Sequence, residues 1–176
     1  MAAIMPTTFA AGNQSVADFN TYISDIERQL LGHSGNSKPF AVVTASAPVA
    51  LTSGVFTAID MDTVTINRGG LWDGSTLTVP TTWAGLYMVT ASVDVDASSG
   101  NKELRISING DEGGPAQNIY GVATAAYARL SVSALMWLDE GDTIEAIVFQ
   151  DSGASVNARA VGSLPQLAAC FLATVN

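Results

Sequence analysis

Residues 87–96, YMVTASVDVD, place an apolar side chain at every odd position, from Tyr87 to Val95, and mostly polar ones between them. This period of two predicts a β-strand with one face in a core and the other facing outward. The same alternation returns at 104–108 and 130–138, and Gly- or Asn-containing turn sequences separate these stretches. Counting such segments predicts eight to ten short strands between Phe40 and Val175, the density of an all-β sandwich or barrel.

The composition fits a protein with much of its surface covered. Of the 176 residues, 48% are hydrophobic but only 13% are charged, and the net charge is −9. An acidic surface repels phosphate, so we expect no nucleic-acid partner and no anionic membrane. The longest apolar runs, 134–138 and 167–173, are too short to span a bilayer. No basic segment precedes an apolar block at the start, which predicts synthesis in the cytoplasm without a secretory signal.

The first 38 residues form a separate N-terminal segment in this interpretation: an arm, an amphipathic helix at about 15–31, and a linker, with the β domain at 39–176. Ser15 is a candidate N-cap and Gly32 a candidate stop. An isolated helix of this length is marginal in water, so its apolar stripe must be buried on its own domain, on other copies, or on a different protein. The residues predicted to anchor or trimerise through this segment are Phe9, Val16, Phe19, Ile23, Ile26 and Leu30.

Two later segments, 146–149 and 167–173, are apolar at consecutive positions. A strand that is dry on both sides in a small antiparallel sandwich needs a neighbour on its outer face. Another copy of the chain is the simplest such neighbour, so an obligate oligomer is predicted.

Residues 56–93 resemble the head domain of the complement-q/tumour-necrosis-factor superfamily. The matching positions are Phe56, Asn67, Gly70, Trp72, Asp73, Pro80, Gly85 and Tyr87. Downstream, the Asn109-Gly110 pair, the Leu-x-x-Gly-Asp turn at 138–142 and the final strand through Phe171 are similar to further family features. The resemblance implies a ten-stranded jelly roll that assembles as a trimer. The expected interface residues are Tyr87, Trp137, Ile147, Phe149 and Phe171. The chain lacks a collagen-like Gly-X-Y stalk and a disulfide pair, because Cys170 is its single cysteine.

The N-terminal segment, residues 7–32, is similar to the opening of many tailed-bacteriophage virion proteins. The matching positions are Phe9, Gly12, Asn20, Ile23, Leu30 and Leu31. Together with a trimeric jelly roll, this resemblance implies an accessory protein of a phage particle: a head decoration, a head fibre or a tail-tip component.

No pattern of catalytic residues emerges. The only histidine, His33, falls in the linker, and no serine or cysteine motif accompanies it. We therefore expect no enzyme activity and no cofactor. Four acidic side chains could bind calcium if their loops met at one end of the domain: Asp94, Asp96, Asp111 and Glu112. Apolar neighbours predict a buried, inert thiol at Cys170.

Aromatic side chains offer another kind of site. Trp72, Trp83 and Trp137 could form a sugar-binding platform, although core or interface positions are commoner for such residues. Trp137 is the best candidate for a contact between copies, and Tyr120 and Tyr127 are the candidate ligand contacts.

The function predicted from the sequence is that of a structural virion protein on the particle exterior. Its expected partners are two further copies of itself and the major capsid protein or another virion protein, attached through the N-terminal arm with the jelly roll projecting outward. The alternative is a tail-tip or fibre adhesin that binds a glycan or protein on the host surface.

Overall fold

The computed structural model describes residues 38–113, 116–120, 127–159 and 164–174. The predicted arm, helix and linker lie outside the described residues, as do the anchoring side chains from Phe9 to Leu30 and His33. The chain divides into two units, Met1–Ser37 and Lys38–Asn176, and the fold reported below is that of the second.

All regular structure in the described residues is β-strand, as predicted. There are twelve strands there rather than ten, and two of them have only two residues: β1 Phe40–Thr44, β2 Val49–Leu51, β3 Thr57–Ala58, β4 Thr63–Arg68, β5 Leu77–Thr78, β6 Gly85–Asp96, β7 Lys102–Ile108, β8 Ala116–Tyr120, β9 Tyr127–Leu138, β10 Thr143–Gln150, β11 Val156–Ala158 and β12 Gln166–Ala173.

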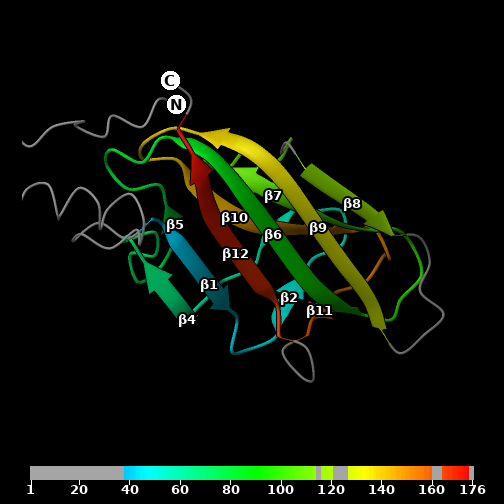
Figure 1. Ribbon diagram of the computed structural model, residues 1–176. Helices are drawn as coiled ribbons and strands as arrows, with labels where there is room; N and C mark the ends of the chain where they lie inside the picture. Colours follow the sequence, from blue (N-terminus) through cyan, green and yellow to red (C-terminus); the bar gives the residue numbers. More distant parts are fainter. Residues whose placement is uncertain (1–37, 114–115, 121–126, 160–163, 175–176) are drawn as a thin grey trace, which may run out of the picture. The chain divides into compact units, whose positions relative to one another are not determined.

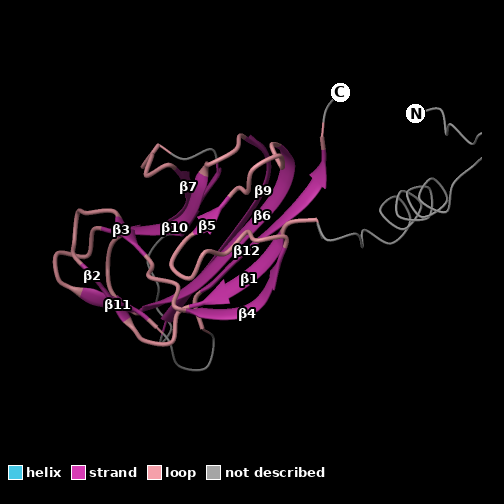
Figure 2. Cartoon of the chain, turned by 90° about the vertical axis from the view of Figure 1, so that its left-hand side faces the viewer, coloured by secondary structure: helices cyan, strands magenta, loops and turns pink. Residues whose placement is uncertain are grey.

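The strands form two antiparallel sheets (Figures 1 and 2). The large sheet has seven strands in the order β2-β11-β6-β12-β1-β4, with β9 on the other side of β6. The small sheet has five strands in the order β3-β10-β7-β8, with β5 also paired to β10. Strands far apart in sequence are thus neighbours, since β12 lies between β1 and β6.

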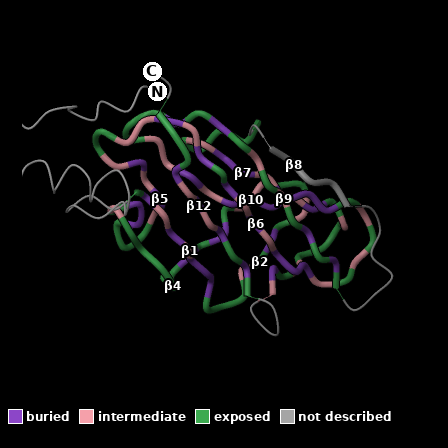
Figure 3. The backbone as a smooth tube through the Cα atoms, viewed as in Figure 1, coloured by how far each residue is buried: buried purple, intermediate pink, exposed green. Residues whose placement is uncertain are grey.

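The core lies between the two sheets, and the alternation read from the sequence sets which side chains enter it. In β6, Tyr87, Val89 and Val95 are fully buried. Ala91 and Val93 are at most 4% exposed. Figure 3 shows buried positions alternating with exposed or intermediate ones along the long strands. Leu104 and Ile106 of β7 and Ile144 and Val148 of β10 meet them from the small sheet.

Two turns carry the conformations that their sequences favour. Asn109 and Gly110 both have positive φ, 55° and 74°, and Asp111 N donates to Ile108 O at 3.0 Å. This is the mirror-image turn that an Asn-Gly pair favours between antiparallel strands. Near the end of β4, the Asn67 side chain accepts from Trp72 N at 3.1 Å and donates to Trp72 O at 2.8 Å, which closes the loop that follows the strand.

Candidate assembly surface

The outer face of the large sheet, which is turned away from the core, changes in character from one end to the other. At the end where β1 begins and β12 finishes, one row is apolar across four strands: Phe40 lies opposite Cys170, Cys170 opposite Met88, and Met88 opposite Leu135. On β4, at the edge of the sheet, the row ends at Arg68, which lies opposite Phe40. The next row pairs Leu86 with Trp137. We call this region the apolar end; its members are Phe40, Leu86, Met88, Leu135, Trp137, Cys170 and Leu172.

Several of these side chains are exposed although they are large and apolar. Leu135 is 59% exposed, Trp137 48%, Leu172 41% and Met88 37%. Single exposed apolar residues are normal on a protein surface, but a contiguous group marks an interaction site. The apolar end is therefore the candidate assembly surface.

The middle of the same face is polar. One row across it consists of Thr44, Gln166, Ser92 and Ser131, all with short or neutral polar side chains. Hydroxyl and amide groups of this kind are hydrated on an open face and offer little apolar area to bury. The candidate surface therefore stops before this row.

Charged residues occupy the opposite end. Arg129 Nε and Nη2 donate to the two Asp94 carboxylate oxygens at 2.8 and 2.9 Å, and Arg159 Nε lies 3.4 Å from Asp96 Oδ1. The two guanidinium groups lie 5.6 and 5.3 Å from the centre of the Tyr127 ring. The hydrogen bonds to Asp94 raise the pKa of Arg129 above its ordinary value. We call Asp94, Asp96, Tyr127, Arg129 and Arg159 the charged end.

The four acidic residues considered for calcium do not come together. Asp94 and Asp96 form ion pairs with arginines at the charged end. Asp111 and Glu112 follow the turn at the other end of β7, where Gly113 N donates to Asp111 Oδ1 at 2.8 Å. Within the described ranges no three acidic, histidine or cysteine side chains are grouped so that they could hold a metal ion. The two halves of this set thus lie at opposite ends of β7, so these four residues do not meet the condition on which calcium binding depended.

Of the five expected interface residues, three are covered by their own chain. Tyr87 is 0% exposed, Ile147 5% and Phe171 6%, which leaves almost no surface for another copy to bury. Tyr87 donates from its hydroxyl to Trp83 O at 2.9 Å, and its ring packs edge-on against Phe171 with centroids 5.4 Å apart. Burial also raises the pKa of Tyr87 to about 12. Trp137 alone among the five is exposed and therefore available to another copy.

The outer face of β10 is also covered from within the chain. Phe149 packs against Phe56, with ring centroids 5.1 Å apart, and the Arg105 guanidinium lies 4.4 Å from the Phe56 ring. Arg105 is in turn paired with Glu103. We expected a second copy to cover the apolar segment 146–149, but Phe56 of the same chain packs there. The sequence could not reveal this contact, because Phe56 is distant from the segment along the chain.

Sequence reasoning missed most of the apolar end. Met88 and Leu135 occupy the positions of their strands that alternate with the core-facing residues, and both are apolar where polar side chains are usual. An apolar residue at such an outward position was the sequence feature that could have indicated this surface. Phe40, Met88, Thr90, Ala168 and Cys170 line a shallow hollow of about 190 Å³ on this face. Cys170 is half-buried there rather than buried, which corrects its predicted position.

The tryptophans do not form a common platform. Trp72 is 9% exposed within the core, whereas Trp83 packs edge-on against Phe171 at 4.9 Å. Trp137 lies outside, and its Nε1 donates to Asp139 Oδ1 at 3.1 Å. Tyr127 is exposed at the charged end, and Tyr120 lies in β8, whose side chains fall outside the described part. In the same described part no helix has the length and apolar character to cross a membrane.

Comparison with known proteins gives a fold. No protein-family model matches the chain, and no curated protein matches its sequence. Among solved structures, murine APRIL matches with a TM-score of 0.55 and 13% identity over 77% of this chain and 99% of that one. PRD1 vertex protein P5 matches with a TM-score of 0.57 and 14% identity over 77% of this chain and 98% of that one. The chain therefore has an antiparallel jelly-roll fold of the tumour-necrosis-factor-like type.

Proposed function

We propose that this protein is a non-enzymatic structural component of a bacteriophage particle, assembled as a trimer through the apolar end of its large sheet. The observation that carries the proposal is the group of exposed apolar side chains at that end: Leu172 of β12, Met88 of β6, and Leu135 and Trp137 of β9. The likeness to PRD1 vertex protein P5 supports a place on a virion, since that protein is by name a vertex protein.

The physical reason for assembly is the asymmetry of the outer face. A side chain such as Leu135, exposed over 59% of its area, gains stability when a second copy removes it from water. The polar middle row and the charged end have no such drive. Copies therefore meet at one end of the face, which leaves the other end open to solvent.

Attachment to the particle is proposed for the N-terminal segment. Its predicted apolar stripe, from Phe9 to Leu30, would bind the major capsid protein or another virion protein. Three such segments on one trimer would turn a weak contact into durable attachment, because binding of the first raises the effective concentration of the others. The jelly rolls would then form a capsid decoration or head fibre on the particle exterior.

The trimer is tested by placing a charge on the apolar end. Leu135→Asp is expected to shift the protein from trimer to monomer in sedimentation equilibrium, with an unchanged far-ultraviolet spectrum because Leu135 is exposed in the single chain. Ser131→Asp, on the same strand and the same face but in the polar row, is the matched control and should remain trimeric. A parent protein that sediments as an 18.2 kDa monomer at working concentration contradicts the assembly proposal.

Attachment is tested separately by deleting residues 1–32 and measuring occupancy on purified particles. The truncated protein should lose particle binding while it keeps its trimer. Undiminished occupancy contradicts anchoring by this segment.

A second candidate function is favoured by the charged end. Tyr127, 39% exposed, and Arg129 lie beside each other and away from the apolar end. Aromatic and arginine side chains are the residue types that recur in recognition surfaces. An adhesin would bind host cells or a glycan array through this region, and Arg129→Ala should then reduce the signal. If the protein binds neither host cells nor the glycan array, the adhesin function is contradicted and only the structural role remains.

A further inference from the structure

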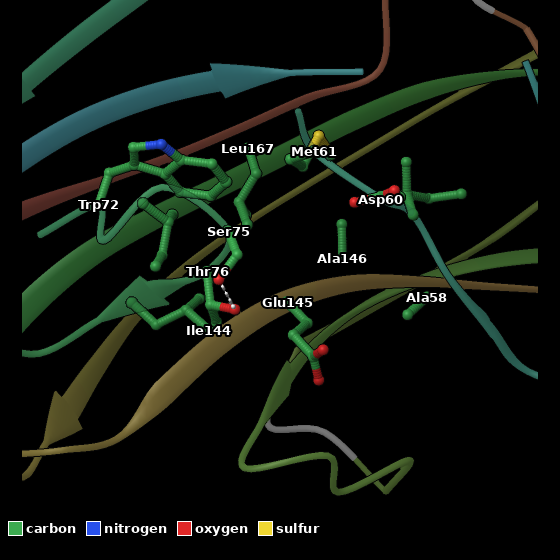
Figure 4. Close-up of a pocket in the computed structure, with 12 residues that line it drawn as sticks. Ala58, Asp60, Met61, Trp72, Ser75, Thr76, Ile144, Glu145, Ala146 and Leu167 are labelled. Carbon is green, nitrogen blue, oxygen red and sulfur yellow. Dashed lines mark hydrogen bonds between the residues drawn. The ribbon is translucent and has the colours of Figure 1, made fainter. Parts of the chain in front are cut away.

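A cavity of about 340 Å³ opens between the two short strands β3 and β5 (Figure 4). These strands pair with different parts of β10: β3 with Ile147 and Val148, and β5 with Thr143 and Ile144. Ala146 O still accepts from Ile59 N at 2.9 Å, so the edge of the small sheet lacks a backbone partner only beside Glu145, and the cavity lies there against side chains of the core.

The floor of the cavity consists of core side chains. Leu77 and Ile144 are each 1% exposed, Leu167 2% and Met61 5%, and Trp72 adds its ring. Figure 4 shows Leu167 between Trp72 and Met61, with Ala146 farther from Trp72, beside Asp60. A ligand group that reaches this floor must be apolar, because the lining there offers carbon atoms and a thioether rather than hydrogen-bond partners.

The rim has a different chemistry. Asp60 comes from the segment after β3, Ser75 and Thr76 from the turn before β5, and Glu145 from β10. Asp60 and Ser75 are exposed, and Thr76 and Glu145 are half-buried. The Glu145 side chain leads away from the apolar floor toward the outer side of β10 (Figure 4). In the described part of the chain neither Asp60 nor Glu145 has an ion-pair or side-chain hydrogen-bond partner.

The volume falls at the lower end of the range of small-molecule sites, and the exposed lining is almost evenly divided between polar and apolar atoms. Such pockets span roughly 300–1,000 Å³ and combine a mainly apolar lining with a few polar groups that fix orientation. Here the polar groups are acidic or hydroxylic, and the whole chain carries a net charge of −9. The pocket lining includes no lysine or arginine that would accept an anionic ligand.

We infer that this cavity is a binding site for a small amphipathic organic cation, with an apolar tail in the floor and the positive charge at the rim. The orientation follows from desolvation: a charge in the floor would lose its hydration without a partner, whereas at the rim it stays hydrated and faces Asp60. Ser75 and Thr76 supply hydroxyl oxygens that accept hydrogen bonds from an ammonium group. A neutral sugar fits less well, since Trp72 is too covered to present a stacking face.

The inference is tested on the full-length protein with three ligands that share one apolar tail and differ in their head group. Hexylammonium, hexanol and hexanoate are titrated against the protein while methyl resonances of Met61, Leu77 and Ile144 are followed by NMR. The ammonium is expected to bind about three- to fivefold tighter than the alcohol, as an exposed ion pair permits, and the carboxylate weakest. Shifts confined to these methyl groups would locate the tail in the cavity.

Two variants separate the head from the tail. Asp60→Asn, at an exposed position, should bring ammonium binding to the level of the alcohol, whereas Glu112→Gln removes an acid outside the cavity and should change nothing. Ala146→Val fills part of the floor and should weaken all three ligands. Equal binding of the three head groups, unaltered binding in Asp60→Asn, or no methyl shifts with any ligand overturns the inference. These measurements need neither a phage particle nor a trimer, so their outcome does not depend on whether the proposed function is correct.

Discussion

Arg129 on β9 lies directly opposite Asp94 on β6, and its Nε and Nη2 donate hydrogen bonds of 2.8 and 2.9 Å to the two carboxylate oxygens. The same pair of strands brings Met88 opposite Leu135 toward the other end. One strand pairing therefore carries both an ion pair and an exposed apolar contact. The outer face of the large sheet is apolar at the end where copies are proposed to meet. It is charged at the opposite end, which is proposed to face solvent or a ligand.

Removing Arg129 should destabilise the domain. The Asp94 side chain is only 5% exposed, so Arg129→Met leaves a nearly buried carboxylate without its partner. We expect a loss of about 1–3 kcal/mol in the free energy of unfolding, measured by urea titration. The double variant with Asp94→Asn should cost less than the sum of the two single variants, because the unpaired charge is gone. A single variant as stable as the parent would show that solvent replaces the guanidinium.

Tyr87 predicts a loss of stability in alkali. Burial raises the pKa of its phenol from 10.0 to about 12 in the folded protein. Since the folded value is the higher one, the stabilisation is complete below about pH 10 and is lost as the pH rises toward 12. Denaturant unfolding across this range should show the decline. Tyr87→Phe should abolish this part of it, at a cost of about 1 kcal/mol at neutral pH for the lost hydrogen bond to Trp83 O.

Gly85 should not tolerate a side chain. A Cβ at this position would lie 2.5 Å from Ala173 O and 2.7 Å from Phe171 Cε2. The first neighbour is backbone and cannot rotate away, so Gly85→Ala is expected to cost about 1–3 kcal/mol in thermal or urea unfolding. Gly113→Ala is a suitable comparison, because its Cβ would meet only the flexible Asp111 carboxylate, at 3.0 Å. Equal stability of the two variants would contradict the predicted clash.

Asn67 should stabilise the loop after β4. Its side chain makes two hydrogen bonds to the backbone of Trp72, and Asn67→Ala removes both. The expected loss is about 1–2 kcal/mol in the free energy of unfolding, together with faster amide exchange at Trp72. Thr65→Ala, on the exposed surface of the same strand, should leave both quantities nearly unchanged. Unaltered exchange at Trp72 in Asn67→Ala would contradict a role in closing the loop.

The structure agrees with the sequence analysis where the signals are local. The period of two in residues 87–96 predicted which side chains of β6 enter the core, because alternate residues of a strand face opposite sides. The Asn109-Gly110 pair predicted its turn, because both residues must adopt positive φ. Asn67 was recognised as part of a family pattern, and its hydrogen bonds to Trp72 now supply a physical reason for that position.

The positions of the expected site residues could not be predicted from the sequence, since they depend on which strands are neighbours. Tyr87 and Phe171 were expected at an interface but fill the core, because β6 and β12 are paired and their rings turn inward together. Ile147 and Phe149 were expected to meet a second copy, but Ile147 is only 5% exposed in the single chain and Phe149 packs against Phe56. The separation of Asp94 and Asp96 from Asp111 and Glu112 has the same origin: whether two acidic loops are close depends on strand direction, which the spacing of residues does not reveal.

By itself, the amino-acid sequence determined the all-β class, the inward face of the long strands, the Asn-Gly turn and the acidic, weakly charged character of the surface, because each depends on residues close together in the chain. Only the tertiary structure decided which outward faces stay open. The pairing of β12 with both β1 and β6 assembled Phe40, Cys170, Met88 and Leu135 into one apolar row, and the division of β10 between β3 and β5 opened the cavity. Exposure is a property of packing among distant segments, and so it follows from the fold rather than from any single stretch of sequence.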